Sequence, residues 1–323
     1  MRIEAATVDD VLRKAYEAIV DSGSETTSTR GKNREIVAVQ ILISEARARV
    51  SRTEARATLY SALGELLWYL AKSDAIGFIE YYAPKYAKHV TVEDGRVVAA
   101  YGPRLFNFRG VDQVRQVIEL LKARPSSRQA VLQFFDCSDL AAETREVPCT
   151  CTVQFLLRNE KLEAIASMRS NDAVRGLPHD VFAFTFLQEI ISRSLGVDVG
   201  RYHHWVGSLH IYDDDREVVG DFVNEGWQQT VGIAMLPMPI GDPWPQIERL
   251  LEAERAFRVD QRGDPWPAGE FRYWDDLIWL LEMFRHIKLR DVARAVDSWD
   301  RRKTVAFDAF IRPRIERIKG AKK

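Results

Sequence analysis

The chain has little cysteine, no long apolar run and almost no net charge. Three cysteines among 323 residues exclude a disulfide-stabilised scaffold, so a reducing, cytoplasmic environment is expected. No stretch approaches the roughly 18 consecutive apolar residues of a membrane span, and the N-terminus lacks the basic start and apolar run of a signal peptide. A formal net charge of −1 argues against a general polyanion binder. We therefore expect neither a membrane nor a nucleic-acid partner, and any bound phosphate to be held by individually placed arginines.

Common nucleotide-binding and metal-binding motifs are also missing. The sequence contains no GxGxxG fingerprint, no P-loop, and no CxxC or HExxH spacing. Its six histidines and three cysteines do not form a zinc pattern, so no metal is expected.

Helical and strand-like segments follow one another without regular βαβ alternation, which favours an α+β fold with a large mixed sheet flanked by helices. Apolar spacing predicts helices at 7–20, 54–72, 111–123 and 181–195. Strands are expected at 35–43, at 128–168 with a turn at RNEK, and at 200–212, and a Ser/Thr/Gly-rich loop is expected at 21–34.

The chain changes character at a proline-rich break over 237–245. Beyond it the pattern is mostly helical, with apolar residues at helical spacing in Trp274, Leu277, Ile278 and Leu281. We therefore expect one domain over 1–240 and a helical C-terminal extension over 241–323 packed on that same domain.

Three short segments carry residues suited to chemistry. Cys149, in VPCTCTVQFLLRNEKL, follows a proline just before an apolar strand, where it is either a nucleophile or a small buried hydrophobe. The segment MRSNDAVRGLPHD (168–180) is either a phosphate site or a loop of local Asx and Ser turns, and its candidate ligands are Arg169 and Ser170. In WVGSLHIY (205–212) two polar side chains share one face of a strand, His210 and Tyr212.

Taken together, these segments resemble the thymidylate synthase superfamily, and within it the pyrimidine hydroxymethylase branch. The likeness rests on CTCTVQFLLRNEKL, MRSNDAVRG and WVGSLHIY, in that order. Upstream, GELLWYL (64–70), AYGPR (100–104) and PSSRQ (125–129) resemble further family segments. The resemblance implies a thymidylate synthase-like fold, with a sheet face forming a homodimer interface and the catalytic domain at 1–240.

The resemblance also implies a covalent mechanism. Cys149 would add as a thiolate to carbon 6 of a pyrimidine and make carbon 5 nucleophilic toward the one-carbon unit of 5,10-methylenetetrahydrofolate. Glu65 would organise water and move protons, and Tyr101 would lie near the proton-transfer path. The alternatives are a partly exposed helix carboxylate for Glu65 and core packing for Tyr101.

Asp180 stands where uracil-using synthases carry asparagine, and its chemistry favours cytosine. Cytosine offers an amino donor and an unprotonated ring nitrogen, whereas uracil offers a carbonyl and a ring N–H. A carboxyl group accepts from the amino group and can share a proton with the ring nitrogen, which also stabilises the covalent adduct. The alternative is that Asp180 caps the helix beginning at 181.

The remaining implied roles concern binding. Phosphate contacts fall to Arg30, Arg169, Ser170 and, across a homodimer interface, Arg128. Sugar contacts fall to His210 and Tyr212. Asp172 resembles a structural or folate-contacting aspartate, and Gly176 is a second expected folate contact. The aromatic folate contact is one of Tyr81, Tyr82 and Tyr86, and Tyr82 is taken as the candidate.

The chain departs from the family pattern at several places. Gln129 replaces the second of two phosphate arginines, Thr150 replaces the histidine common after the nucleophile, and the aromatic folate segment is YYAPKY. The expected activity is 5-hydroxymethylation of dCMP or CMP, with dCMP slightly preferred. The alternatives are a thymidylate synthase or dUMP hydroxymethylase and, more remotely, a non-catalytic member that binds nucleotide or RNA.

Overall fold

The structure is a computed structural model that describes residues 1–51, 53, 58–141, 146–226, 234–259, 265–303 and 307–320. The chain forms two compact units, Met1–Ala234 and Met235–Lys323. The first unit contains every residue for which the sequence predicts a role in the site.

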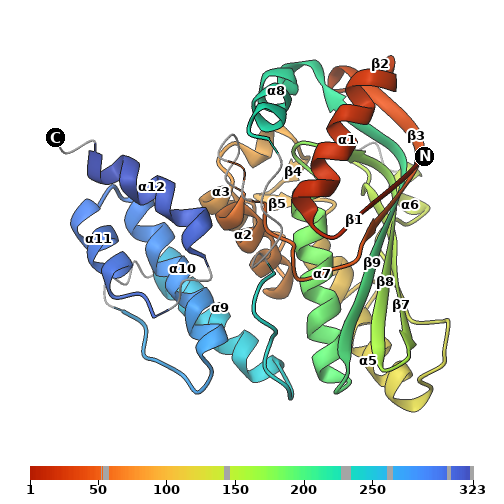
Figure 1. Cartoon of the computed structure of the whole chain (residues 1–323). Coiled ribbons are helices and arrows are strands. Elements are labelled where there is room, and N and C mark those ends of the chain that lie inside the picture. The colour runs from red at the N-terminus through yellow and green to blue at the C-terminus, as the bar shows by residue number, and fades with distance from the viewer. Residues whose placement is uncertain are drawn as a thin grey trace. The chain divides into compact units, whose positions relative to one another are not determined.

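A seven-stranded mixed sheet runs through the described part of the first unit (Figure 1). Its order is β1-β3-β9-β8-β7-β6, and β2 pairs with β3. The β1–β3 and β8–β9 pairs are parallel and the other pairs antiparallel, which confirms the predicted α+β class with a large mixed sheet. The strands are Arg2–Ala5 (β1), Ser24–Ser28 (β2), Gly31–Ile43 (β3), Val131–Gln133 (β6), Thr150–Arg158 (β7), Lys161–Asp172 (β8) and Asp198–Tyr212 (β9).

Two hairpins show where turn signals in the sequence are informative and where they mislead. The predicted β7–β8 turn is confirmed: Asn159 and Glu160 both have positive φ, 50° and 59°, as a two-residue type I′ connection requires. The predicted loop over 21–34 was wrong, because SETTS pairs with β3 as an antiparallel edge strand. Threonine favours strands as readily as serine favours turns, so composition alone did not separate the two. The hairpin places Arg30 at its tip.

Helix α7 (Leu177–Ser194) is buried on nearly all sides and holds the site rigidly. Phe182, Phe184 and Phe186 are at most 1 % exposed. At 100° per residue Phe184 points away from the other two, so the helix must be covered on two sides. The sheet strands β8 and β9 cover one side and α2 (Leu59–Leu70) another. Burial of each ring contributes about 1.5–3 kcal/mol, so the start of α7 is a firm platform.

Helix α1 (Val8–Ser22) packs on the same side of the sheet as α7 (Figure 1). Thr7 is its N-cap, and the Thr7 side chain accepts a hydrogen bond from the Asp10 amide at 3.2 Å. The remaining described elements of this unit are Ile76–Tyr82 (α3), Tyr86–Lys88 (η1), Val92–Glu93 (β4), Arg96–Val97 (β5), Tyr101–Phe106 (α4), Gln113–Ala123 (α5), Ser138–Ala141 (α6), Asp213–Asp215 (η2) and Arg216–Asn224 (α8).

The described part of the second unit is helical, as predicted from its apolar spacing. Trp274, Leu277, Ile278 and Leu281 are all buried on α10. Its helices are Trp244–Arg258 (α9), Arg272–Lys288 (α10), Val292–Asp300 (α11) and Asp308–Gly320 (α12). No helix in the described ranges is both long enough and apolar enough to cross a bilayer.

Candidate active site

Cys149 lies in the turn leading into β7, held by Arg169 of the neighbouring strand β8. The Arg169 amide donates to the Cys149 carbonyl at 2.9 Å. The guanidinium Nε donates to the Pro148 carbonyl at 3.0 Å and Nη2 to the Val147 carbonyl at 2.6 Å. The same Nη2 lies 3.8 Å from the Cys149 sulfur. Arg169 therefore both fixes the turn and places positive charge against the thiol.

Burial nevertheless raises the pKa of the Cys149 thiol above its ordinary value of 9.0. The charges of Arg169 and Arg30 lower this pKa, whereas Asp180 and Glu146 raise it further. At neutral pH the substrate-free protein therefore holds a thiol, and the thiolate must be generated during turnover.

The rate of Cys149 alkylation is expected to rise about tenfold per pH unit between pH 7 and 9 without levelling off, because only the thiolate reacts. Mass spectrometry of the peptide that contains Cys149, after brief iodoacetamide pulses at each pH, measures this rate. The exposed Cys137 serves as an internal reference for reagent quality. A plateau for Cys149 below pH 8 would contradict the effect of burial on the thiol.

Glu65 lies on α2, partly exposed, and accepts hydrogen bonds from two tyrosines. Its Oε1 accepts from the hydroxyls of Tyr69 at 2.7 Å and of Tyr86 at 3.4 Å. Burial raises the pKa of Glu65, and the two tyrosine hydrogen bonds lower it. A carboxyl group with a raised pKa, held between hydroxyls, is suited to moving protons to and from water.

Two tyrosines of the YYAPKY segment, Tyr82 and Tyr86, have different surroundings. The Tyr82 ring is buried against Gly64, where an added Cβ would lie 2.1 Å from the ring, so Gly64 allows α3 to approach α2. Tyr86 reaches Glu65 instead, and its ring packs edge-on against Trp68 at 5.9 Å. The folate contact of Tyr82 stays a prediction, and Tyr86 is a stronger candidate for lining the site.

Asp180 lies in the first turn of α7, beyond the cap position. The N-cap is Gly176, so the capping role considered for Asp180 was wrong. The Asn171 side-chain amide donates to Asp180 Oδ2 at 2.7 Å. Burial raises the pKa of Asp180 well above its ordinary 3.8, and the negative charge of Glu65 raises it further. The site therefore favours the protonated form of Asp180 more than water does.

Tyr101 is hydrogen-bonded to Thr150, the residue that follows Cys149. Its hydroxyl donates to Thr150 Oγ1 at 3.0 Å and accepts from the Thr150 amide at 3.1 Å. Burial raises the pKa of Tyr101 well above 10, and the nearby charges of Cys149 and Asp180 raise it further. The charge of Glu65 also acts on Asp180, so each of the four predicted catalytic side chains lies within electrostatic range of at least one of the others.

The predicted phosphate and sugar ligands lie on the β2–β3 turn and on strands β8 and β9. The exposed Arg30 donates through Nη2 to the His89 carbonyl. The His210 and Tyr212 rings meet edge-on at 4.9 Å, and the Tyr212 hydroxyl lies 3.4 Å from Ser28 Oγ. Ser170 lies on β8 directly beside Ser208 of β9.

Asp172 has a structural role that the sequence anticipated. Its Oδ1 accepts from the amides of Val174 and Arg175, both at 2.9 Å, and so shapes the turn from β8 into α7. Gly176 closes that turn where space is short, since an added Cβ would lie 2.7 Å from the Asn171 amide nitrogen. Any larger residue there would press on the Asn171–Asp180 hydrogen bond.

Arg128 is the predicted ligand that the structure does not bring to Cys149. Val131 pairs with Gln154 in the middle of β7, whereas Cys149 precedes the start of that strand. At 3.3 Å per residue, Arg128 lies roughly 25 Å along the sheet from Cys149. It lines a separate surface groove with Pro125, Ser126, Leu157, Arg158, Asn159, Glu160 and Val197.

Several contacts in the site had no signal in the sequence. Tyr86 was considered only as a folate contact, and the hydrogen bonds of Tyr69 and Tyr86 to Glu65 depend on how α2 and η1 fold together. Asn171 was part of a recognised motif, but its contact with Asp180 depends on the turn between them. His179 hydrogen-bonds Ser61 Oγ and the Arg175 carbonyl, both at 2.9 Å, and so ties the start of α7 to α2.

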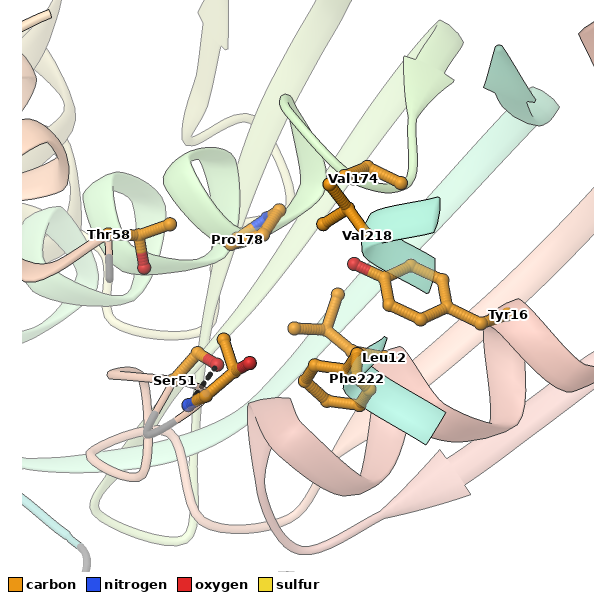
Figure 2. Close-up of a pocket in the computed structure, with 9 residues that line it drawn as sticks. Leu12, Tyr16, Ser51, Thr58, Val174, Pro178, Val218 and Phe222 are labelled. Carbon is orange, nitrogen blue, oxygen red and sulfur yellow. Dashed lines mark hydrogen bonds between the residues drawn. The ribbon is translucent and has the colours of Figure 1, made fainter. Parts of the chain in front are cut away.

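Figure 2 shows a small apolar cavity beside the turn from β8 into α7, lined among others by Leu12 of α1, Val174 of that turn and Phe222 of α8. Its volume is about 10 Å³. That is room for one water at most, so no substrate binds there. The described residues contain no cluster of three or more His, Cys, Asp or Glu able to hold a metal ion.

Comparison with known proteins shows which family the chain belongs to. Residues 12–235 match the family described as Thymidylate synthase. The chain belongs to the thymidylate synthase family. The resemblance drawn from Cys149, the RSND segment and the SLHIY segment is thereby confirmed at the level of the superfamily.

Relatives within the family carry more than one name. A "Thymidylate synthase" of Francisella philomiragia is 28 % identical over 175 residues, which cover 50 % of this chain and 64 % of the relative. A "Thymidylate synthase" of Bacillus licheniformis is 33 % identical over 159 residues, 47 % of this chain and 57 % of the relative. A "Deoxyuridylate hydroxymethyltransferase" of Bacillus phage SP01 is 32 % identical over 185 residues, 53 % of this chain and 47 % of the relative. The chain thus spans less than two thirds of the length of these relatives.

Proposed function

We propose that this thymidylate synthase family member is a folate-dependent one-carbon transferase, and specifically a cytidylate 5-hydroxymethylase. Asp180 carries the proposal. It is a carboxyl group with a raised pKa at the site of the candidate nucleophile, oriented by Asn171. An asparagine could pair with either pyrimidine, but only a carboxylic acid can transfer a proton to a ring nitrogen.

The first step follows from Cys149 and Asp180. The Cys149 thiolate forms a bond to carbon 6, and the π electrons shift through carbons 5 and 4 onto ring nitrogen 3. That nitrogen takes the Asp180 proton, which leaves a neutral enamine with a nucleophilic carbon 5. In cytosine this nitrogen carries a lone pair and no hydrogen, so it can accept the proton, whereas in uracil it already carries hydrogen.

The residues present fit a pterin group beside this enamine. Asp172 uses Oδ1 for the backbone, and no donor within the described ranges is bonded to its Oδ2, which is left to accept from an amino group. When bound there, 5,10-methylenetetrahydrofolate would supply a one-carbon unit at the aldehyde oxidation level.

The later steps use Tyr101 and Glu65. In this proposal the Tyr101 hydroxyl relays the proton released from carbon 5. Glu65, with Tyr69 and Tyr86, holds the water that adds to the exocyclic methylene of the nucleotide, and the thiolate of Cys149 then leaves carbon 6. The overall balance is cytidylate, methylenetetrahydrofolate and water giving 5-hydroxymethylcytidylate and tetrahydrofolate.

The second candidate is a thymidylate synthase or a dUMP hydroxymethylase, which the names of the relatives favour. Incubation with methylenetetrahydrofolate and CMP, dCMP, UMP or dUMP in turn separates the possibilities. A cytidylate hydroxymethylase converts CMP or dCMP without producing dihydrofolate. Dihydrofolate formed with dUMP would establish a thymidylate synthase instead.

A homodimer built on the sheet completes the proposed site. On the face away from α7, Trp205 is 44 % exposed and Val131 is 37 % exposed. An exposed apolar face on a large sheet favours association with a second copy. Since Arg128 lies roughly 25 Å from its own Cys149 by strand rise, we infer that it serves the phosphate in the neighbouring subunit.

Mixed dimers test this assignment. Cys149→Ser and Arg128→Ala chains are co-expressed with different tags, and the heterodimer is isolated on both tags. If Arg128 acts across the interface, one site keeps both residues, so the heterodimer is expected to show about half the wild-type activity while each parent homodimer stays low. If Arg128 serves its own chain, no site is complete and the heterodimer will be as inactive as its parents.

A further inference from the structure

Behind Asp180 lies a chain of buried polar side chains that the proposed reaction does not use. Asn171 Oδ1 lies 2.9 Å from His204 Nε2, and His204 Nδ1 lies 2.8 Å from the Tyr202 hydroxyl. Tyr202 and His204 are 0 % exposed and Asn171 is 3 % exposed. Burying three polar side chains costs free energy unless every polar group is hydrogen-bonded. Apolar residues would fill the same space without that cost, so packing alone does not explain these three side chains.

The chemistry of the groups fixes the direction of each hydrogen bond. Burial lowers the pKa of His204 to about 3, so the imidazole is neutral and carries one hydrogen. Asn171 Nδ2 donates to Asp180, which leaves Asn171 Oδ1 as an acceptor, so His204 must donate from Nε2. Nδ1 of His204 is then an acceptor, and the Tyr202 hydroxyl donates to it.

We propose that Tyr202, His204 and Asn171 form a positioning relay whose donors all point toward Asp180 and keep Asp180 Oδ2 as an acceptor. The acid hydrogen of Asp180 is thereby confined to Oδ1, the oxygen left to face the pyrimidine. A carboxyl group with a fixed O–H suits an unprotonated ring nitrogen, so the relay acts as a specificity device for cytosine. This inference deepens the role proposed for Asp180 and rests on it.

The neighbouring backbone supports the same arrangement. Gly176 leaves just enough room for Asn171, because an added Cβ would lie 2.7 Å from its Nδ2 and 3.4 Å from Asp180 Oδ2. The amide of Asn171 is thus held by hydrogen bonds to the acid and to the histidine, and the absence of a side chain at Gly176 leaves room for it.

Substrate-free protein labelled with ¹⁵N-histidine and ¹³C-aspartate tests the relay independently of any reaction. His204 is expected to show a protonated Nε2 and an unprotonated Nδ1. His204→Leu is expected to move the Asp180 carboxyl ¹³C signal, whereas His204→Gln, whose amide can donate from the Nε2 position, is expected to leave it near its wild-type position. A His204 protonated on Nδ1, or an Asp180 signal unmoved in His204→Leu, would overturn the relay.

Nucleotide affinity by calorimetry gives the second readout. His204→Leu is expected to reduce the ratio of CMP to UMP affinity by about tenfold, and His204→Gln to restore most of it, since a lost hydrogen bond to an ionisable group corresponds to roughly 10- to 100-fold. Tyr202→Phe, which keeps the ring, is expected to give a smaller fall. Thr185→Val on α7 removes a buried hydroxyl that bonds only to backbone carbonyls, and it serves as the matched control.

The two readouts separate the relay from the proposed function. A wild-type protein without cytidylate preference but with the predicted tautomer and ¹³C response supports the relay and refutes the function. A wild-type protein that prefers cytidylate, with a ratio unchanged in His204→Leu, refutes the relay and leaves the function standing.

Discussion

Cys149→Ser is expected to lose roughly 10³- to 10⁶-fold in turnover, because the covalent adduct at carbon 6 has no other source. A serine hydroxyl is far less acidic than a thiol, and burial in this site disfavours its anion further. Turnover is measured as hydroxymethylated product per unit time with cytidylate and methylenetetrahydrofolate.

The control for this variant is Cys151→Ser, two residues further along the chain, on strand β7. Cys151 is partly buried, but its backbone rather than its thiol makes the contacts with Phe134 and Phe135. It is expected to keep most of the wild-type turnover. A Cys149→Ser protein that melts normally and retains full turnover would rule out the covalent mechanism.

Asp180→Asn is expected to lower kcat/KM for the preferred cytidylate by roughly 10²- to 10⁴-fold, the usual contribution of a positioned acid. The uridylate value should fall less or rise, because an amide pairs with the ring N–H and carbonyl of uracil. The decisive quantity is the ratio of kcat/KM values for CMP and UMP, and for dCMP and dUMP. An unchanged ratio would refute the role of Asp180 as the group that reads the base.

Stability distinguishes a specific effect of this substitution from misfolding. Because the folded-state pKa of Asp180 is raised, ionisation favours the unfolded chain as pH rises above 3.8 toward the folded pKa. The wild-type protein loses stability over that window, and an asparagine does not. Asp180→Asn should therefore melt at or above the wild-type temperature at pH 7, with the difference shrinking as the pH falls toward 4.

The sequence was informative wherever one face of an element carries a regular pattern. The helical spacing of the apolar residues Trp274, Leu277, Ile278 and Leu281 predicted a helix where α10 forms. It failed at β2, where SETTS satisfies a turn and a strand equally well and only pairing with β3 decides. Its catalytic candidates were recognisable because each lies in a short, spaced motif.

The relay shows what such motifs leave out. Tyr202 and His204 look like ordinary residues of a half-buried strand, and their partner Asn171 belongs to a different strand. Only the folded β8–α7 turn shows that the three side chains form a series of hydrogen bonds whose last member, Asn171, donates to Asp180. Arg128 illustrates the converse, since its motif was visible but its distance from Cys149 emerges only from the strand register.

The most direct test of the central claim is tritium release from carbon 5 of labelled CMP, dCMP, UMP and dUMP in the presence of methylenetetrahydrofolate. Release reports activation of carbon 5 itself, whatever the later steps. The account predicts release from CMP or dCMP well above that from either uridylate, with no dihydrofolate formed and with the release abolished in Cys149→Ser. Release from dUMP alone, accompanied by dihydrofolate, would contradict it.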